Sequence, residues 1–143
     1  MSFPLDALSS PGGPLHREPP NLAEFEGLVR SGERRLVDAE RKENSLESRF
    51  DLAYNASHAL CLAALRHKGY RSSKRYIVFQ VLPHTLGLGP EVWRVLDRAH
   101  NERNRGEYEG DLTVDERLLG EVIECCKTVV SALRTLPPME RRR

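Results

Sequence analysis

The stretch that decides the fold spans residues 46–69 and reads LESRFDLAYNASHALCLAALRHKG. Its apolar and small side chains recur at the spacing of an α-helix, and this stripe consists of Phe50, Ala53, Tyr54, Ser57, Cys61, Ala64, Leu65 and Lys68. Small residues crowd the centre of the stripe, which permits the close approach of another helix. Asn44 with Glu47 supplies a start signal, and Gly69 is placed to end the helix in a left-handed cap. The stretch therefore predicts a buried helix over residues 46–68.

Similar patterns surround this helix on both sides. The other segments with helical periodicity are residues 22–42, 75–82, 91–108 and, after a capping box formed by Thr113 and Glu116, a last segment that ends near Leu136. Pro83 cannot continue a regular turn, so we expect it to end the third helix. No stretch shows the alternation of a β-strand. Because short loops join amphipathic helices, the sequence predicts an all-α, antiparallel bundle of about five helices.

The length and composition fit one ordinary domain. The chain has 143 residues, of which 39% are apolar and 30% charged, and its formal net charge is +1. Five prolines and two adjacent glycines occur in residues 1–20, which we interpret as a flexible or extended arm without a core of its own. Residues 21–136 then form the helical domain, and residues 137–143 a basic tail.

The three cysteines, Cys61, Cys125 and Cys126, form neither a disulfide framework nor a Cys-x-x-Cys pair. The histidines show no metal-ligand spacing with one another, so we expect no metal site and no cofactor. Reduced thiols favour a cytoplasmic protein. The chain has no signal peptide pattern and no apolar run of about 20 residues, so we expect no membrane association.

A polar stripe runs along the predicted helix at residues 91–108. At about 100° per residue, one side of this helix carries His100, Arg103, Asn104, Glu107 and Tyr108. This side borders the apolar side, a position suited to a subunit seam or to the lining of a cleft. The spacing is consistent with two interpretations, which are a solvated face held by ion pairs and a binding site.

The pair Arg103-Asn104 resembles the signature of HEPN domains (higher eukaryotes and prokaryotes nucleotide-binding). In that signature an Arg and a polar residue, often Asn, precede a His by several positions. Residues 49–58, RFDLAYNASH, are similar to the aromatic and Ala-rich helix of the same family. The resemblance covers about Leu22–Leu136.

The resemblance implies an antiparallel helical bundle that forms a homodimer and brings two motifs into one cleft. Many members of the family are metal-independent endoribonucleases, often toxins paired with a small nucleotidyltransferase, whereas others bind nucleotides or assist a neighbouring enzyme. The function expected from this resemblance is therefore that of a HEPN-type protein that interacts with nucleotide or RNA. The alternative is a non-catalytic helical interaction or dimerisation module.

The chain departs from the HEPN signature at position 108, where Tyr stands in place of His. RNA cleavage of this kind needs a base for the 2′-hydroxyl and a cation for the phosphate. Arg103 is the candidate cation, but a phenol with a pKa of about 10 is a poor base at neutral pH. His100 lies one turn earlier and is the candidate substitute base. The candidate catalytic residues are thus Arg103, His100 and Tyr108, with Asn104 and Glu107 as ligand-binding residues.

Cationic and aromatic residues also alternate between residues 66 and 76. Because cations combined with aromatic rings suit a nucleic-acid backbone and its bases, the candidate phosphate contacts here are Arg71, Lys74 and Arg75. The other interpretation is a solvated loop whose tyrosines pack inward. His58 lies on the predicted buried helix, and we interpret it as a packed or interfacial histidine.

Overall fold

The computed structural model describes residues 3–109 and 115–139, with side chains described for residues 5–106 and 115–139. Within these ranges the chain forms seven helices and one two-stranded antiparallel sheet. The elements in chain order are α1 (Phe3–Leu8), β1 (Leu15–Arg17), α2 (Leu22–Ala39), α3 (Leu46–His67), β2 (Tyr70–Ser72), α4 (Ile77–Gln80), α5 (Leu82–Thr85), α6 (Pro90–Glu109) and α7 (Glu116–Arg134). The predicted all-α bundle is confirmed.

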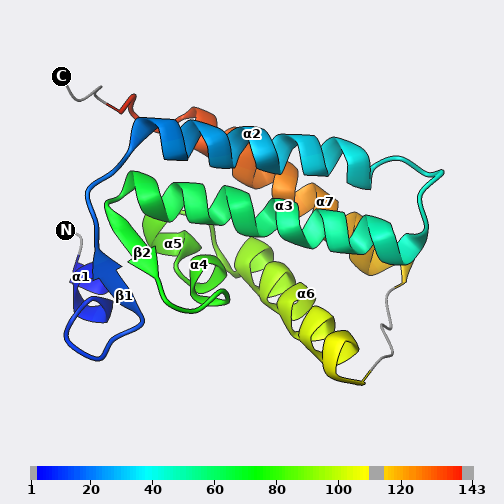
Figure 1. Ribbon diagram of the computed structural model, residues 1–143, viewed down its shortest axis with the longest axis horizontal. Helices are drawn as coiled ribbons and strands as arrows, with labels where there is room; N and C mark the ends of the chain where they lie inside the picture. The colour runs from blue at the N-terminus through cyan, green and yellow to red at the C-terminus, as the bar shows by residue number, and fades with distance from the viewer. Residues whose placement is uncertain (1–2, 110–114, 140–143) are drawn as a thin grey trace.

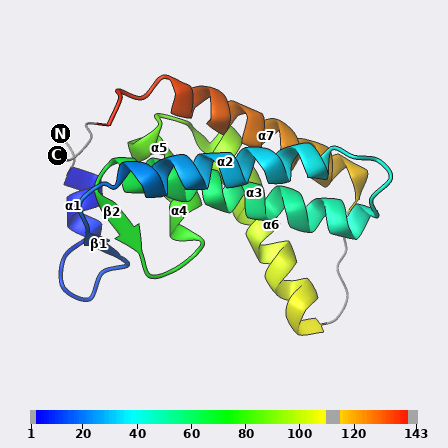
Figure 2. The same ribbon diagram turned by 45° about the horizontal axis from the view of Figure 1, so that its top comes forward.

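Helix α3 is the centre of the bundle. It packs against α2 and α7, which run along the same long axis, and against α4, α5 and α6 (Figure 1). Its large buried side chains Phe50, Leu60 and Leu65 join Leu96 of α6 and Val122 of α7 in one apolar core. Helix α6 crosses the bundle obliquely, and its C-terminal half diverges from α3 and α7 in both views (Figures 1 and 2). No helix in the described part of the chain combines the length and the apolar character that a membrane crossing needs.

At Gly32, α2 lies in close contact with α3. A Cβ atom built at Gly32 would lie 2.6 Å from Cγ of Leu60 and 3.3 Å from the carbonyl oxygen of Ala56. Gly32, which the sequence marks only as a weak point of the first expected helix, therefore forms a close contact with α3. The absence of a side chain at Gly32 is what lets the two helices meet at this distance.

Two helix starts differ from those expected. Ser45, not Asn44, caps α3, because its Oγ accepts a hydrogen bond from the backbone N–H of Ser48 at 3.1 Å. Asp115 caps α7 in the same way, with its Oδ1 2.7 Å from the backbone nitrogen of Leu118. The expected capping residue Thr113 lies outside the described residues. The oxygen of a short polar side chain caps a helix by accepting a hydrogen bond from the backbone N–H three residues later. Polar residues one or two positions apart in the sequence therefore compete to be the capping residue.

The third expected helix, over residues 75–82, is divided into α4 and α5. The break falls at Val81, where φ is −93° and ψ is 4°. Pro83 does not end a helix as expected but lies in the first turn of α5. Proline is compatible with that turn because the first N–H groups of a helix have no intrahelical acceptor.

Within the segment 1–20, expected to be a flexible or extended arm, the structure places two regular elements, α1 and β1. Strand β1 pairs with β2 in an antiparallel register that sets Leu15 opposite Ser72 and Arg17 opposite Tyr70. Leu5 and Leu15 are each only 2% exposed and belong to the main core. Strands of three residues are too short to show a recognisable period of two, so the sequence pattern did not reveal them.

Candidate functional site

The expected polar stripe on α6 meets α3 and α4 in a group of seven side chains. Three aromatic rings pack together here, with the centroids of Tyr54 and Phe79 6.1 Å apart. The ring of His100 lies 6.0–6.3 Å from the rings of Tyr54, Tyr76 and Phe79. We call this group the basic-aromatic cluster, and it consists of Tyr54, His58, Arg75, Tyr76, Phe79, His100 and Arg103.

Two guanidinium groups lie close to the buried ring of Tyr54. The Cζ atom of Arg103 is 5.1 Å from the ring centroid, and that of Arg75 is 5.7 Å from it. These distances fit cation–π interactions, which stabilise a cation over an electron-rich ring. Arg103 is further held by Asp51 of α3, whose Oδ1 accepts a hydrogen bond from Nε at 3.2 Å. Two arginines from distant parts of the sequence are thus brought to one aromatic side chain.

Both ring nitrogens of His100 are engaged in hydrogen bonds. Nδ1 lies 2.9 Å from the hydroxyl oxygen of Tyr54, and Nε2 lies 3.0 Å from Nδ2 of Asn104. Because the amide nitrogen of Asn104 can only donate, Nε2 accepts and the ring proton resides on Nδ1. Nδ1 then donates to the Tyr54 hydroxyl oxygen. Through these two hydrogen bonds His100, which is only 8% exposed, connects Asn104 to the buried Tyr54.

Burial, together with two neighbouring arginines, favours the neutral form of His100. Burial lowers the pKa of His100, and the nearby cations Arg75 and Arg103 lower it further, although Asp97 partly opposes them. As the candidate substitute base, His100 would have to release its hydrogen bond with Asn104 before Nε2 could accept a proton. Its geometry is therefore that of a residue that orients Asn104 and Tyr54.

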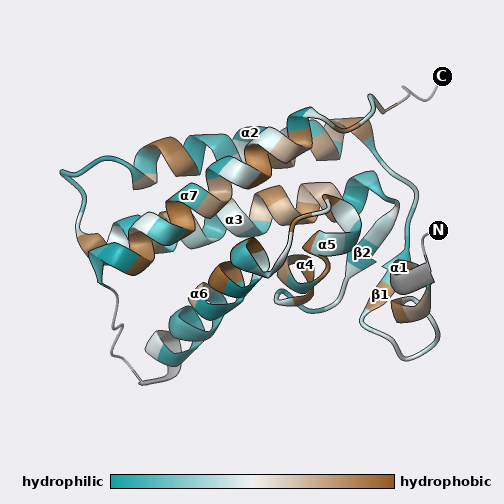
Figure 3. Ribbon diagram, turned by 180° about the vertical axis from the view of Figure 1, so that it is seen from behind, coloured by the Kyte–Doolittle hydropathy of each residue, from teal (hydrophilic) through white to brown (hydrophobic). Residues whose placement is uncertain are grey.

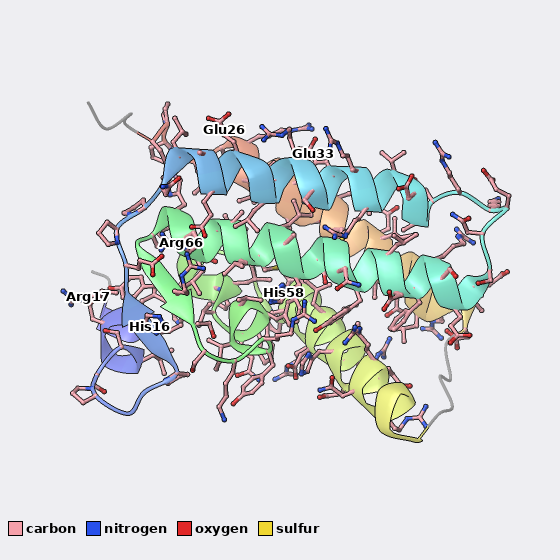
Figure 4. All side chains as sticks on the ribbon, viewed as in Figure 1. His16, Arg17, Glu26, Glu33, His58 and Arg66 are labelled. Carbon is pink, nitrogen blue, oxygen red and sulfur yellow. The ribbon has the colours of Figure 1, made fainter. Side chains whose placement is uncertain are left out.

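His58 is a cluster residue that the sequence did not assign to a site. It lies one helical turn after Tyr54 on the side of α3 that faces α4 and α6 (Figure 4). Its ring contacts Phe79 edge-on, with the centroids 6.3 Å apart. Burial and the charges of Arg75, His100 and Arg103 lower the pKa of His58 to about 4. The i,i+4 spacing of Tyr54 and His58 was the available signal. It indicates a shared cluster only once the positions of α6 and Arg75 are known.

The remaining expected site residues lie apart from this cluster or outside the described side chains. Lys74 is exposed in the turn between β2 and α4, where its backbone N–H donates to Oγ of Ser72 at 3.0 Å. Glu107 and Tyr108 belong to α6, but their side chains lie outside those that the structure describes. Of the expected residues, the structure brings together Arg75, His100, Arg103 and Asn104.

Arg71 takes part in a second charged group, at the N-terminal segment. Its Nη2 donates to Oε2 of both Glu18 and Glu24 at 2.6 Å. A hydrogen bond and the charge of Arg71 hold the pKa of Glu18 below its ordinary value. The basic stretch at residues 66–76 is therefore partly neutralised by acids more than 40 residues earlier, and Arg71 is engaged within the fold.

Two surface hollows among the described residues are separate from the cluster. One, of about 370 Å³, is lined by charged residues of α6 and α7, among which Arg98 and Arg117 both pair with Glu121. The other, of about 290 Å³, lies between α2 and α7, where Glu40 pairs with Lys127. Among the side chains that are described, no three His, Cys, Asp or Glu residues gather in a way that fits a metal ion.

Comparison with known proteins does not add a family to this description. No family model matches the chain, and neither the curated proteins nor the solved structures include a match to it. The class defined by the fold is that of a helical bundle, and the site is a basic-aromatic cluster where α3, α4 and α6 meet.

Proposed function

We propose that this chain is a HEPN-type protein that interacts with nucleotide or RNA, and that the ligand binds at the basic-aromatic cluster. The observation that carries the proposal is the position of Arg75 and Arg103 beside the ring of Tyr54. Guanidinium groups bind phosphate oxygens through paired N–H donors, and bases stack on aromatic and guanidinium planes. Arg103 is also the arginine of the segment that resembles the HEPN signature.

The binding form of this function is better supported than RNA cleavage. A metal-independent ribonuclease needs a base at the 2′-hydroxyl, and the signature position for that base holds Tyr108. His100 has both ring nitrogens in hydrogen bonds and a lowered pKa. These features favour a site that holds a phosphate-bearing ligand without cleaving it.

The proposal includes a homodimer and a nucleotidyltransferase-type partner protein. The C-terminal half of α6 diverges from the bundle, and most of its residues are hydrophilic (Figure 3). The cluster lies at the base of this diverging half. A second copy packed along it would bring two clusters to one cleft, in an interface that needs more than about 1,000 Å² of buried area to be stable.

The proposal is tested by replacing Arg103 with alanine. We expect Arg103→Ala to weaken the binding of a short single-stranded RNA, and of adenosine monophosphate, at least tenfold. The physical reason is the loss of charge-assisted hydrogen bonds to phosphate, which contribute about 1.5–3 kcal/mol each. Fluorescence anisotropy measures the RNA affinity, calorimetry measures the nucleotide affinity, and light scattering measures the molecular mass.

The matched control is Arg98→Ala on the same helix, because Arg98 pairs with Glu121 of α7 and lies outside the cluster. This variant should retain the wild-type affinity to within about twofold, as expected for a surface ion pair that contributes little. Unchanged binding in Arg103→Ala would contradict the proposal. A wild-type dimer that binds neither RNA nor nucleotide would instead favour the alternative of a helical dimerisation module.

A further inference from the structure

His58 differs from the other histidine of the cluster in its hydrogen bonding. Within the part of the chain that the structure describes, neither of its ring nitrogens has a hydrogen-bond partner, whereas both nitrogens of His100 do. The ring is half-buried against Phe79 and is not sealed from solvent. An imidazole in this state retains one donor and one acceptor for a bound molecule.

Among the described residues, the groups whose charges act on His58 are all basic. Arg75 approaches from the turn before α4, and His100 and Arg103 approach from α6. Two acids lie close to the cluster, since Asp51 pairs with Arg103, and Asp97 acts on His100 and accepts a hydrogen bond from Gln80. The free protein therefore holds His58 neutral beside two guanidinium groups, and an anion placed among them would be attracted by both.

We propose that His58, Arg75 and Arg103 form a subsite for a phosphomonoester, and that His58 takes up a proton when the phosphate binds. This inference rests on the proposed function and specifies its ligand. A monoester carries close to two negative charges at neutral pH, whereas a phosphodiester carries one. The second charge matches a site with two arginines and an imidazole that becomes cationic. The ligand is a terminal phosphate group, either of a nucleotide or as free phosphate.

Proton uptake follows from the balance of charges around the imidazole. In the free protein the pKa of His58 is lowered to about 4. Burial is the larger cause, and the surrounding cations are the second. A bound dianion reverses the second effect and adds an opposite charge within hydrogen-bond distance. An opposite charge at this range raises the pKa of a histidine by about 1–3 units. The complex is then protonated at a pH where the free protein is not.

The direct test is a titration of the histidine side chains by NMR in wild-type protein, with and without saturating adenosine monophosphate. We expect the midpoint of His58 to rise by at least about 1 pH unit in the complex. His16 is the internal control, because it is exposed on β1 and lies outside the cluster. A His58 midpoint that stays unchanged in the saturated complex would overturn the inference while leaving nucleotide binding itself in place.

A second measurement uses the pH dependence of affinity. Because the pKa of His58 rises from about 4 to about 5–7 on binding, the ratio of wild-type to variant affinity for adenosine monophosphate should increase as the pH falls from about 7 to about 5. His58→Asn and His58→Gln keep a polar side chain without a titrating charge, so their affinity should not increase over this range. Two variants are used so that a folding defect in one leaves the other informative. An increase of equal size in both variants would contradict the role of His58.

Three ligands distinguish the possible sources of the phosphate group, which are a nucleotide monoester, a cyclic diester and free phosphate. Cyclic adenosine monophosphate, a phosphodiester, should bind at least tenfold more weakly than adenosine monophosphate. Inorganic phosphate should shift the His58 midpoint if the subsite recognises phosphate alone, and should fail to do so if the nucleoside is required. Equal affinity for the cyclic and open nucleotides would overturn the monoester assignment. RNA binding that depends on Arg103 but not on His58 would overturn this inference and leave the proposed function standing.

Discussion

Arg66 is the largest side chain that the described fold buries completely, and it is a cation. It lies in the last turn of α3, is 1% exposed, and points toward the segment that precedes α2 (Figure 4). Its Nε donates to Oε1 of Glu24 at 2.6 Å, and its other nitrogens donate to the carbonyl oxygens of Glu18, Pro19 and Tyr70. Burial raises the pKa of Glu24, but hydrogen bonds from Arg71 and Arg66 outweigh this and lower it overall.

We predict that Arg66→Met lowers the free energy of unfolding by about 3 kcal/mol, because it leaves Oε1 of Glu24 and three carbonyl groups without the donor that Arg66 supplies. Urea unfolding followed by circular dichroism measures this value. Arg66→Lys should be intermediate, since an ammonium cannot reproduce the fork of N–H groups. Arg30→Met, at an exposed position of α2, is the control and should change stability by less than about 0.5 kcal/mol. Equal stability of Arg66→Met and Arg30→Met would contradict this assignment.

At the scale of elements, the contact between α2 and α3 depends on one absent side chain. Gly32 faces the buried side chain of Leu60, so the helix pair is held at a distance that no other residue permits without a shift. Gly120 of α7 provides a contrast, because a Cβ atom there meets nothing within 4 Å. The same residue type therefore has opposite significance in two helices of one bundle.

We predict opposite effects of alanine at these two glycines. Gly32→Ala gains about 1 kcal/mol of helix propensity but overpacks the helix contact by about 1–3 kcal/mol, so a net loss of stability is expected. Gly120→Ala gains the same propensity with no clash and should stabilise the protein by up to about 1 kcal/mol. Thermal unfolding of the two variants measures the difference. A more stable Gly32→Ala variant would show that α2 and α3 are not in tight contact at this point.

At the scale of the whole molecule, the N-terminal segment completes one end of the bundle. The α1–β1 segment lies beside β2 (Figure 1). Arg17 and Tyr70 both contact Asp6 of α1. Leu5 and Leu15 add two buried side chains to the core, each of which contributes about 1.5–3 kcal/mol when fully buried. The segment thus stabilises the fold although it contains few regular elements.

We predict that deletion of residues 1–17 lowers the melting temperature by roughly 10 °C, as expected from the loss of about 3 kcal/mol in a domain of this size. A pair of adjacent substitutions provides the matched control. Leu15→Asp places a charge in the core and should have a similar effect, whereas His16→Asp changes an exposed residue of the same strand and should have little effect. An unchanged melting temperature after the deletion would restore the interpretation of a flexible arm.

The long helices and their order could be predicted from the sequence because each follows from local patterns. The apolar stripe at residues 46–68 and the left-handed Gly69, with φ of 88°, lie within α3 and at its end as expected. The candidate residues Arg103, His100 and Asn104 were found because they share one face of a single helix. Patterns of this kind depend only on the helical repeat, which is a local property of the chain.

Only the tertiary structure decided which charges meet. Arg66 and Glu24 are 42 positions apart and belong to no common sequence motif. Their pairing neutralises part of what looked like a basic surface. His58 became part of a candidate site because α6 and Arg75 fold against α3 and bring the charges of two guanidinium groups to act on it. Burial and long-range contacts set the protonation of such groups, and neither is encoded in the spacing of neighbouring residues.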